Sequence, residues 1–221
     1  MKNYSSILVT TAATALVTFI LTLQPAYADN WYIKPNLGLS QMSDIQAAAT
    51  GISGITGPVK VNLESGFNAG ISVGRFFDSN FLVELGWEYR SNSSETILTA
   101  AEVFPDGNYA SSSFFLNSAY FFDTAYTWRP YLGAGLVWLQ EVDIDLERNG
   151  NELSYSGSGQ TGLQFFAGVD YEFNSSWSAQ LEARFVRVND ISLTGEEGAI
   201  GELSKLNYRP YGLQLAIKYT F

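Results

Sequence analysis

The chain has 221 residues, with 12 basic and 22 acidic side chains, a formal net charge of −10, and neither histidine nor cysteine. These absences exclude nucleophile–histidine catalytic pairs, zinc sites of the usual ligand types and disulfide frameworks, and the acidic balance argues against nucleic acid as a partner. Only 15% of the residues are charged while another 15% are aromatic, whereas globular proteins average about 25% charged residues.

Residues 1–28 are expected to form a cleavable secretory signal peptide. Lys2 precedes an uncharged apolar run over 7–23, and Ala26-Tyr27-Ala28 then supplies a small-x-small cleavage site. A retained membrane anchor is the alternative, because the run is close to the minimum length of a spanning helix. Cleavage after Ala28 leaves one mature domain, 29–221. Export without any cysteine is typical of a bacterial envelope protein that uses no disulfides.

After the signal peptide, large apolar residues fall on alternate positions in segments separated by Gly, Ser, Asn and Asp. Leu213, Leu215 and Ile217, for example, alternate with small or polar residues. This period of two is typical of strands with one apolar and one polar face. The predicted strands are 31–40, 64–76, 81–91, 109–122, 129–147, 153–173, 177–188 and 207–221.

The connections between these segments alternate in length. Short links near 77–80, 123–128 and 174–176 alternate with long ones near 41–63, 92–108 and 189–206. An up-and-down barrel with all its tight turns at one end produces this alternation. A soluble ligand-binding barrel would have charge-rich outer positions, but here the apolar face is rich in aromatics at the segment ends, as at membrane interfaces. We therefore predict an all-β, eight-stranded antiparallel up-and-down transmembrane barrel.

The sequence Asn149-Gly150 predicts a two-residue hairpin turn, because a type I′ turn needs positive φ at both central positions. In the resulting register Ile144 pairs with Tyr155 and Leu136 with Leu163, all on the outer face. The strand 129–147 is longer than the 9–11 residues of a membrane crossing. Its outer third is therefore expected to project as a two-stranded ribbon.

The predicted ribbon has two different faces. One face is apolar and, if exposed, would mark a surface for interaction with a partner: Val142, Ile144, Leu146, Leu153 and Tyr155. The other face carries the acidic residues Glu141, Asp143, Asp145 and Glu147. Carboxylate oxygens are ligands for Ca²⁺, so this face is either a calcium site or an ordinary solvated strand face.

Several segments together resemble a known family. They are the signal peptide, the eight alternating strands, Arg129-Pro-Tyr-Leu-Gly-Ala-Gly-Leu-Val137, Gly168-Val-Asp-Tyr-Glu-Phe-Asn-Ser-Ser-Trp177 and the terminal Tyr219-Thr220-Phe221. Over essentially the whole mature chain they resemble the small outer-membrane β-barrels related to the opacity proteins and to the barrel domain of outer membrane protein A. The resemblance implies a monomer in the bacterial outer membrane, surrounded by lipids and lipopolysaccharide. It also implies that Ile217, Tyr219 and Phe221 form the signal read by the barrel-assembly machinery.

Charged residues on the inward-facing positions form a candidate interior network. They are Lys34, Glu84, Glu88, Arg90, Asp170, Glu172, Glu182, Arg184 and Lys218. Eight strands leave room only for side chains, so these charges are expected to plug the barrel with salt bridges. A charge-lined pore or gate is the alternative.

Three classes of function follow from this barrel. The favoured one is a non-enzymatic structural or adhesion scaffold without cofactor or metal, presenting its loops and the 142–157 hairpin to an extracellular protein ligand. A small porin-like channel for solutes or ions is the alternative. An enzyme acting on lipid A ranks last, because the chain has no histidine base.

Overall fold

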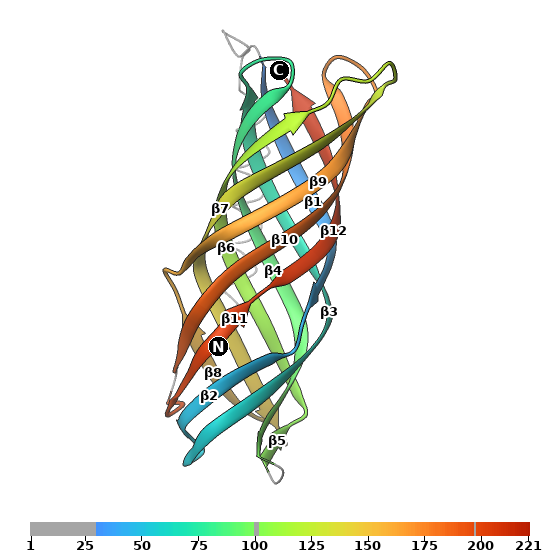
Figure 1. The fold of residues 1–221 in the computed structure, drawn as a ribbon. Coiled ribbons are helices and arrows are strands. Elements are labelled where there is room, and N and C mark those ends of the chain that lie inside the picture. The colour runs from blue at the N-terminus through green and yellow to red at the C-terminus, as the bar shows by residue number, and fades with distance from the viewer. Residues whose placement is uncertain (1–29, 100–101, 197) are drawn as a thin grey trace, which may run out of the picture. The chain divides into compact units, whose positions relative to one another are not determined.

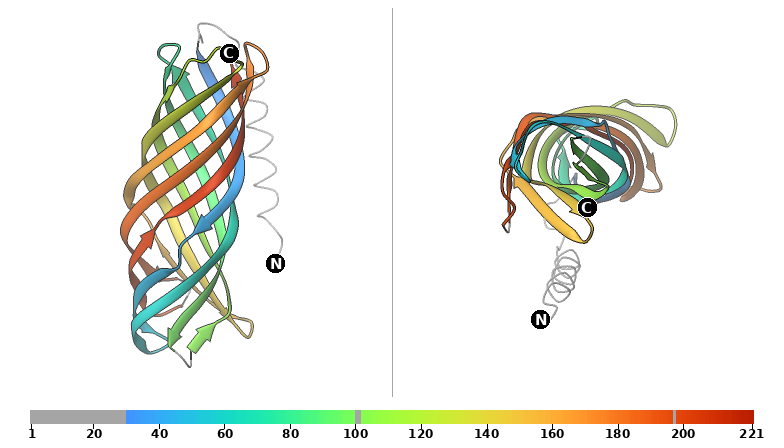
Figure 2. Two further views of the ribbon diagram at one scale, coloured as in Figure 1. Left: turned by 45° about the vertical axis from the view of Figure 1, so that its right-hand side comes forward. Right: turned by 90° about the horizontal axis from the view of Figure 1, so that it is seen from below.

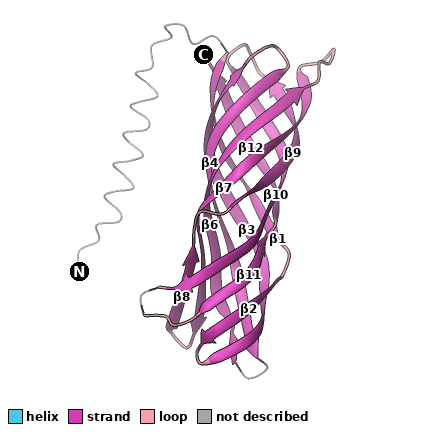
Figure 3. Ribbon diagram, turned by 60° about the vertical axis from the view of Figure 1, so that its left-hand side comes forward, coloured by secondary structure: helices cyan, strands magenta, loops and turns pink. Residues whose placement is uncertain are grey.

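The computed structural model describes residues 30–99, 102–196 and 198–221. The predicted signal peptide, 1–28, lies outside these ranges. Asn30–Thr220 form one compact unit that is built almost wholly of strands (Figure 3). Within the described ranges, no helix is long and apolar enough to cross a membrane.

Twelve strands lie in the described part of the chain. They are β1 (Trp31–Met42), β2 (Ile45–Ile52), β3 (Ile55–Phe76), β4 (Phe81–Thr99), β5 (Glu102–Phe104), β6 (Asp106–Phe121), β7 (Trp128–Arg148), β8 (Asn151–Gly157), β9 (Thr161–Glu172), β10 (Trp177–Gly195), β11 (Glu202–Tyr208) and β12 (Pro210–Thr220).

Eight of these strands close a ring next to the tight turns (Figure 2). Around the ring they are β1, β3, β4, β6, β7, β9, β10 and β12, each antiparallel to both neighbours. The ring closes between its first and last strands, where Leu37 pairs with Leu215 and Ser40 with Gly212. The predicted eight-stranded antiparallel barrel is confirmed.

The outer surface of this ring is apolar. Leu37, Leu136 and Leu215 are 63%, 60% and 64% exposed. β1, β9 and β12 contain 12, 12 and 11 residues, close to the length of a tilted membrane-spanning strand. We call this part the membrane half. It comprises 31–42, 66–76, 81–93, 109–121, 128–139, 161–172, 177–188 and 210–220.

Aromatic side chains surround the membrane half at two levels. Beside the tight turns, Trp177 pairs across strands with Tyr219. At the opposite level, Phe114 pairs with Trp138 and their rings are 6.3 Å apart. Aromatic rings of this kind are typical of the two interfaces of a membrane barrel.

Further strand pairings continue the barrel beyond the membrane half. Here β2 pairs with β3 and β11, β8 with β7 and β10, and β11 with β10. Figure 1 shows β2, β5 and β8 gathered at the end opposite to the last residues of β12. We call this part the outer half, which comprises 45–63, 94–99, 102–108, 142–157, 191–196 and 198–208.

The predicted hairpin register is confirmed, but the predicted facing of its outer part is wrong. Asn149 and Gly150 both have positive φ, and Ile144 pairs with Tyr155 as expected. The two ends of β7 nevertheless face opposite ways, because the ladder to β6 contains a bulge. Ser112 pairs with Glu141 while the next residue, Ser113, pairs with Leu139. Gln140 is therefore an extra residue, and it reverses the side-chain alternation beyond it.

The apolar face of the predicted ribbon consequently points into the barrel. Val142, Ile144, Leu146 and Tyr155 are each 0% exposed, and Leu153 is half-buried. The expectation of an exposed apolar interaction face is thus wrong. These side chains form the centre of an apolar core in the outer half, together with residues of β2, β3, β10 and β11.

Other strand boundaries differ from the prediction for the same reason. The predicted loops 41–63 and 189–206 are largely strands, and the predicted strand 153–173 is broken at 158–160. Irregular pairing occurs between Leu63 and Gly66 and again beyond Val188. Each irregularity shifts the apolar positions by one residue, so an uninterrupted period of two could not be followed through them.

Candidate functional site

The structure places the predicted interior charges inside the membrane half. Lys34, Glu84, Glu88, Arg90, Glu182, Arg184 and Lys218 are each at most 5% exposed, and Asp170 is 0% exposed. Glu172 lies on the same face of β9 as Asp170, but at the end of the strand, where it is exposed and 3.8 Å from Arg129.

Arg184 lies at the centre of a chain of ion pairs from β4 and β10. Its Nη2 is 2.7 Å from Oε1 of Glu182 and its Nη1 is 3.4 Å from Oε2 of Glu88. The other carboxylate oxygen of Glu88 is 2.5 Å from Nη2 of Arg90. Buried charges of alternating sign therefore cross the interior, and each has at least one partner of opposite charge.

Uncharged groups complete the coordination of Glu182. The Tyr131 hydroxyl donates to Oε2 of Glu182 at 3.0 Å. The amide Nε2 of Gln214 donates to Oε1 of the same carboxylate at 2.8 Å. Asn68 in turn donates from Nδ2 to Oε1 of Gln214 at 2.9 Å. These amide side chains extend the network from β10 through β12 to β3.

A second pair lies closer to the tight turns. Lys34 Nζ is 2.6 Å from Oε2 of Glu84, which also accepts from the Tyr32 hydroxyl at 2.8 Å. Asn117 donates from Nδ2 to the other oxygen of Glu84 at 3.2 Å. Glu84 therefore receives donors from β1 and β6.

An ion pair and an aromatic cluster close the turn end of the interior. Lys218 Nζ lies 3.0 and 3.1 Å from the two carboxylate oxygens of Asp170. The same ammonium is 5.1 Å from the ring centre of Phe76 and 5.4 Å from that of Phe121. Tyr131 stacks on Phe121 at 4.6 Å. This end is filled by rings and one paired cation.

Glycines make room for the large interior side chains. Gly133 lies opposite Phe166, as the predicted register requires, and a Cβ on it would lie 2.3 Å from Cζ of that ring. Gly86 likewise faces Phe115, with a Cβ position 2.3 Å from Cζ. Small residues opposite large ones let eight strands close around a filled interior.

Sequence reasoning found the charges but missed their uncharged partners. Tyr32 and Tyr131 were not among the predicted interior residues, although Tyr32 lies on the same face of β1 as Lys34. Asn68, Asn117 and Gln214 share the inward face of their own strands. The period of two that identified the charges would have identified all five.

The acidic face of the β7 hairpin lies on the outside of the outer half. Burial, followed by the charges of Asp145, Glu141 and Glu196, raises the pKa of Asp143 to about 6. Among the described residues, no group of three or more acidic side chains is arranged to hold a metal ion. Glu147 is exposed like Glu141.

The residues of the expected assembly signal end the last strand. Ile217 faces outward and is 44% exposed, and Tyr219 lies beside Trp177 at a ring distance of 4.7 Å. Phe221 follows directly after β12. Their use by an assembly machinery stays a prediction.

Comparison with known proteins identifies relatives of this barrel. The model of the family described as outer membrane protein beta-barrel domain matches residues 11–221. The outer membrane protein OprG from Pseudomonas aeruginosa is similar at 15% identity and a TM-score of 0.66, over 88% of this chain and 97% of that one.

Two further solved structures are similar at the level of the fold. Neisserial surface protein A has 17% identity and a TM-score of 0.51, over 86% of this chain and 97% of its own. Outer membrane protein AlkL, studied in lipid bilayers, has 16% identity and a TM-score of 0.52, over 90% and 93%. The search of curated proteins found no match.

Proposed function

Because the chain belongs to the outer membrane protein beta-barrel domain family, we propose that it is a closed, non-enzymatic scaffold of the bacterial outer membrane. The protein is located in that membrane. Short turns of such barrels face the periplasm and the longer segments face outward, so the outer half extends into the extracellular space. The scaffold holds this rigid half clear of the bilayer.

The filling of the interior is the observation that carries this proposal. In the membrane half the space is occupied by paired charges around Arg184 and by the aromatic cluster beside Lys218. In the outer half it is occupied by the apolar core around Ile144. A polar, hydrated lumen would be needed for ions to pass, and an apolar core opposes hydration.

The chemistry of the interior also favours a non-enzymatic role. Each of the buried carboxylates Glu84, Glu88 and Glu182 accepts hydrogen bonds from at least two side chains. Such carboxylates are engaged in structure and are not available as a general base. The chain has no histidine or cysteine to take that role.

Single-channel recording in planar bilayers tests the closed state. The purified protein is expected to insert without giving steady current, because the charges of the membrane half stay paired. The double variant Glu182→Ala with Arg184→Ala lacks the central ion pair and has a larger interior space, and its current is recorded for comparison. Steady open-channel current from the unmodified protein would contradict the proposal.

A small channel for solutes or ions is the second candidate, and one observation favours it. Several buried polar atoms have no hydrogen-bond partner among the described residues: Asn68 Oδ1, Arg90 Nε, Ser94 Oγ, Thr96 Oγ1 and Tyr109 OH. Arg90 and Thr96 lie on the inner face of β4. Such groups are ordinarily satisfied by buried water, and a continuous file of water there would carry current in the same recordings.

The role of the scaffold is either envelope integrity or contact with an extracellular protein. The exposed contact surface is the polar exterior of the outer half together with residues 198–201, where Ile200 is 78% exposed. Lipids and lipopolysaccharide surround the membrane half. A strain without the protein should lose adhesion or resistance to detergents, and a strain that loses neither would contradict both roles.

A further inference from the structure

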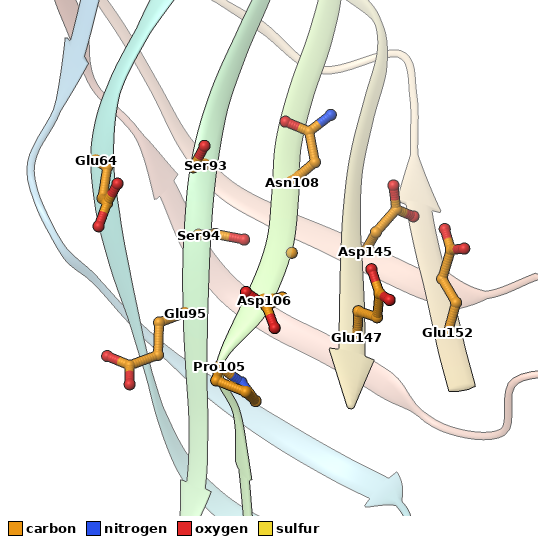
Figure 4. Close-up of a pocket in the computed structure, with 11 residues that line it drawn as sticks. Glu64, Ser93, Ser94, Glu95, Pro105, Asp106, Asn108, Asp145, Glu147 and Glu152 are labelled. Carbon is orange, nitrogen blue, oxygen red and sulfur yellow. The ribbon is translucent and has the colours of Figure 1, made fainter. Parts of the chain in front are cut away.

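A groove on the outer half is lined by six carboxylates. It encloses about 460 Å³ across β3, β4, β6, β7 and β8 (Figure 4). The acidic residues are Glu64, Glu95, Asp106, Asp145, Glu147 and Glu152, and the lining contains no Lys or Arg. Within the part of the chain that the structure describes, none of the six belongs to an ion pair.

Two of the six accept a hydrogen bond from a neutral side chain. Asn62 donates to Oε2 of Glu95 at 2.7 Å, and Ser154 donates to Oδ1 of Asp145 at 2.8 Å. Arg148, which follows Glu147 on β7, is already paired with Glu102 at 3.0 Å. Arg148 therefore does not neutralise the carboxylates of the groove.

Three of the carboxylates form a row across adjacent strands. Asp106 on β6 is directly opposite Glu147 on β7, which is directly opposite Glu152 on β8. Residues directly opposite each other on adjacent strands have Cβ atoms about 5 Å apart, and like charges at such positions destabilise a sheet. A ligand with positive charges along the row would remove this repulsion.

An unpaired hydroxyl opens onto the same groove. Ser94 is 5% exposed and its Oγ has no hydrogen-bond partner among the described residues. On β4, Ser94 lies between Ser93, which pairs with Asn108 of β6, and Thr96, which pairs with Phe104 of β5. In Figure 4 the hydroxyl points from β4 toward β6, among the lining residues. A ligand N–H would supply the missing hydrogen bond.

The spacing favours an extended organic cation over a single metal ion. No group of three or more acidic side chains in the described ranges is positioned to hold one ion. Adjacent strands are instead about 4.8 Å apart, and amines joined by propyl or butyl chains have a comparable spacing. The volume also lies within the range of small-molecule sites, about 300–1,000 Å³.

We propose that this groove binds a small linear polyamine. Its ammonium groups lie against Asp106, Glu147 and Glu152, and one N–H donates to Oγ of Ser94. The site is on the exterior, so binding requires neither conduction nor an opening of the barrel.

Calorimetric titration of the purified protein in neutral, lipopolysaccharide-free micelles tests the site, with spermidine as the probe. The unmodified protein is expected to bind one spermidine saturably. The double variant Glu147→Gln with Glu152→Gln should bind at least tenfold more weakly. The matched control, Glu141→Gln with Asp190→Asn, removes two exposed charges that do not line the groove and should bind like the unmodified protein.

Three results would overturn the proposal. Equal weakening in both double variants would mean that spermidine responds only to net charge. Equal affinity for Mg²⁺ and spermidine at matched ionic strength would exclude recognition of an extended cation. Binding of an oligolysine peptide without binding of spermidine would assign the groove to a protein partner. Heat-modifiable gel mobility shows that each variant is folded.

Discussion

At the scale of single residues, Arg184 and Glu182 decide whether the interior of the membrane half is stable. Arg184 is 4% exposed and contacts Glu182 and Glu88, while its guanidinium carbon lies 4.8 Å from the ring centre of Phe115. Burying a charge costs free energy unless it is paired. The pairing therefore allows charged side chains to fill the barrel.

Replacing Glu182 by Ala should lower the free energy of unfolding by about 3–5 kcal/mol, the usual cost of breaking a buried pair. The loss arises because Arg184, Tyr131 and Gln214 all lose their acceptor. Urea unfolding in micelles measures it. Glu172→Ala, at an exposed position, is the control and should change little. An unchanged midpoint for Glu182→Ala would contradict the network.

Asp143 makes the outer half sensitive to pH. Burial first, then the charges of Asp145 and Glu141, raise its folded-state pKa to about 6 from the ordinary 3.8. A raised carboxyl pKa means that protonation stabilises the fold. This contribution is fully present below pH 3.8 and is lost as the pH rises through about 6.

Asp143→Asn should therefore stabilise the protein near pH 7, by about 1 kcal/mol once solvent screening of this partly exposed group is allowed for. It should also flatten the pH dependence of the melting temperature between pH 4 and 6, which is roughly the window between the two pKa values. Melting curves of both proteins across that window provide the measurement. Identical slopes would show that Asp143 does not titrate there.

At the scale of strands, one extra residue on β7 separates two parts of the strand whose apolar side chains face opposite sides of the barrel. Leu136 faces lipid, whereas Ile144 faces the interior, and the bulge at Gln140 lies between them. Both ends of the strand have alternating sequences. The membrane half buries its polar face and the outer half its apolar face, as a water-exposed barrel does.

Deleting Gln140 should invert the outer end of β7. Ile144 and Leu146 would turn outward and Asp145 inward, because a shift of one residue moves every side chain to the opposite face. The outer half should become sensitive to protease while the membrane half stays protected in vesicles. Gln140→Ala keeps the bulge and is the control. Equal protease resistance of the deletion variant would contradict this explanation.

At the scale of the whole molecule, the sequence was enough to predict the strands in which apolar and polar residues alternate without a break. The lipid-facing positions on β12, such as Leu213 and Leu215, follow the period of two without interruption. The turn at Asn149-Gly150 determined the hairpin register on its own, since its backbone requirement is local.

The outer half could not be predicted, because its bulges depend on pairing between distant strands. Gln140 is an ordinary polar residue, and nothing local marks it as the extra one in the ladder. Asp190 and Lys205 have positive φ, at 57° and 61°, yet neither residue type requires that conformation. The apolar residues beyond each break were therefore assigned to the wrong face.

Labelling of single cysteines tests the two-part barrel most directly, since the chain has no cysteine of its own. A water-soluble maleimide is added to vesicles containing Leu136→Cys, Ile144→Cys or Glu147→Cys. Lipid should protect the first and the apolar core the second, so that only Glu147→Cys reacts quickly. If Ile144→Cys reacts as fast as Glu147→Cys in a folded protein, the outer half does not enclose an apolar interior.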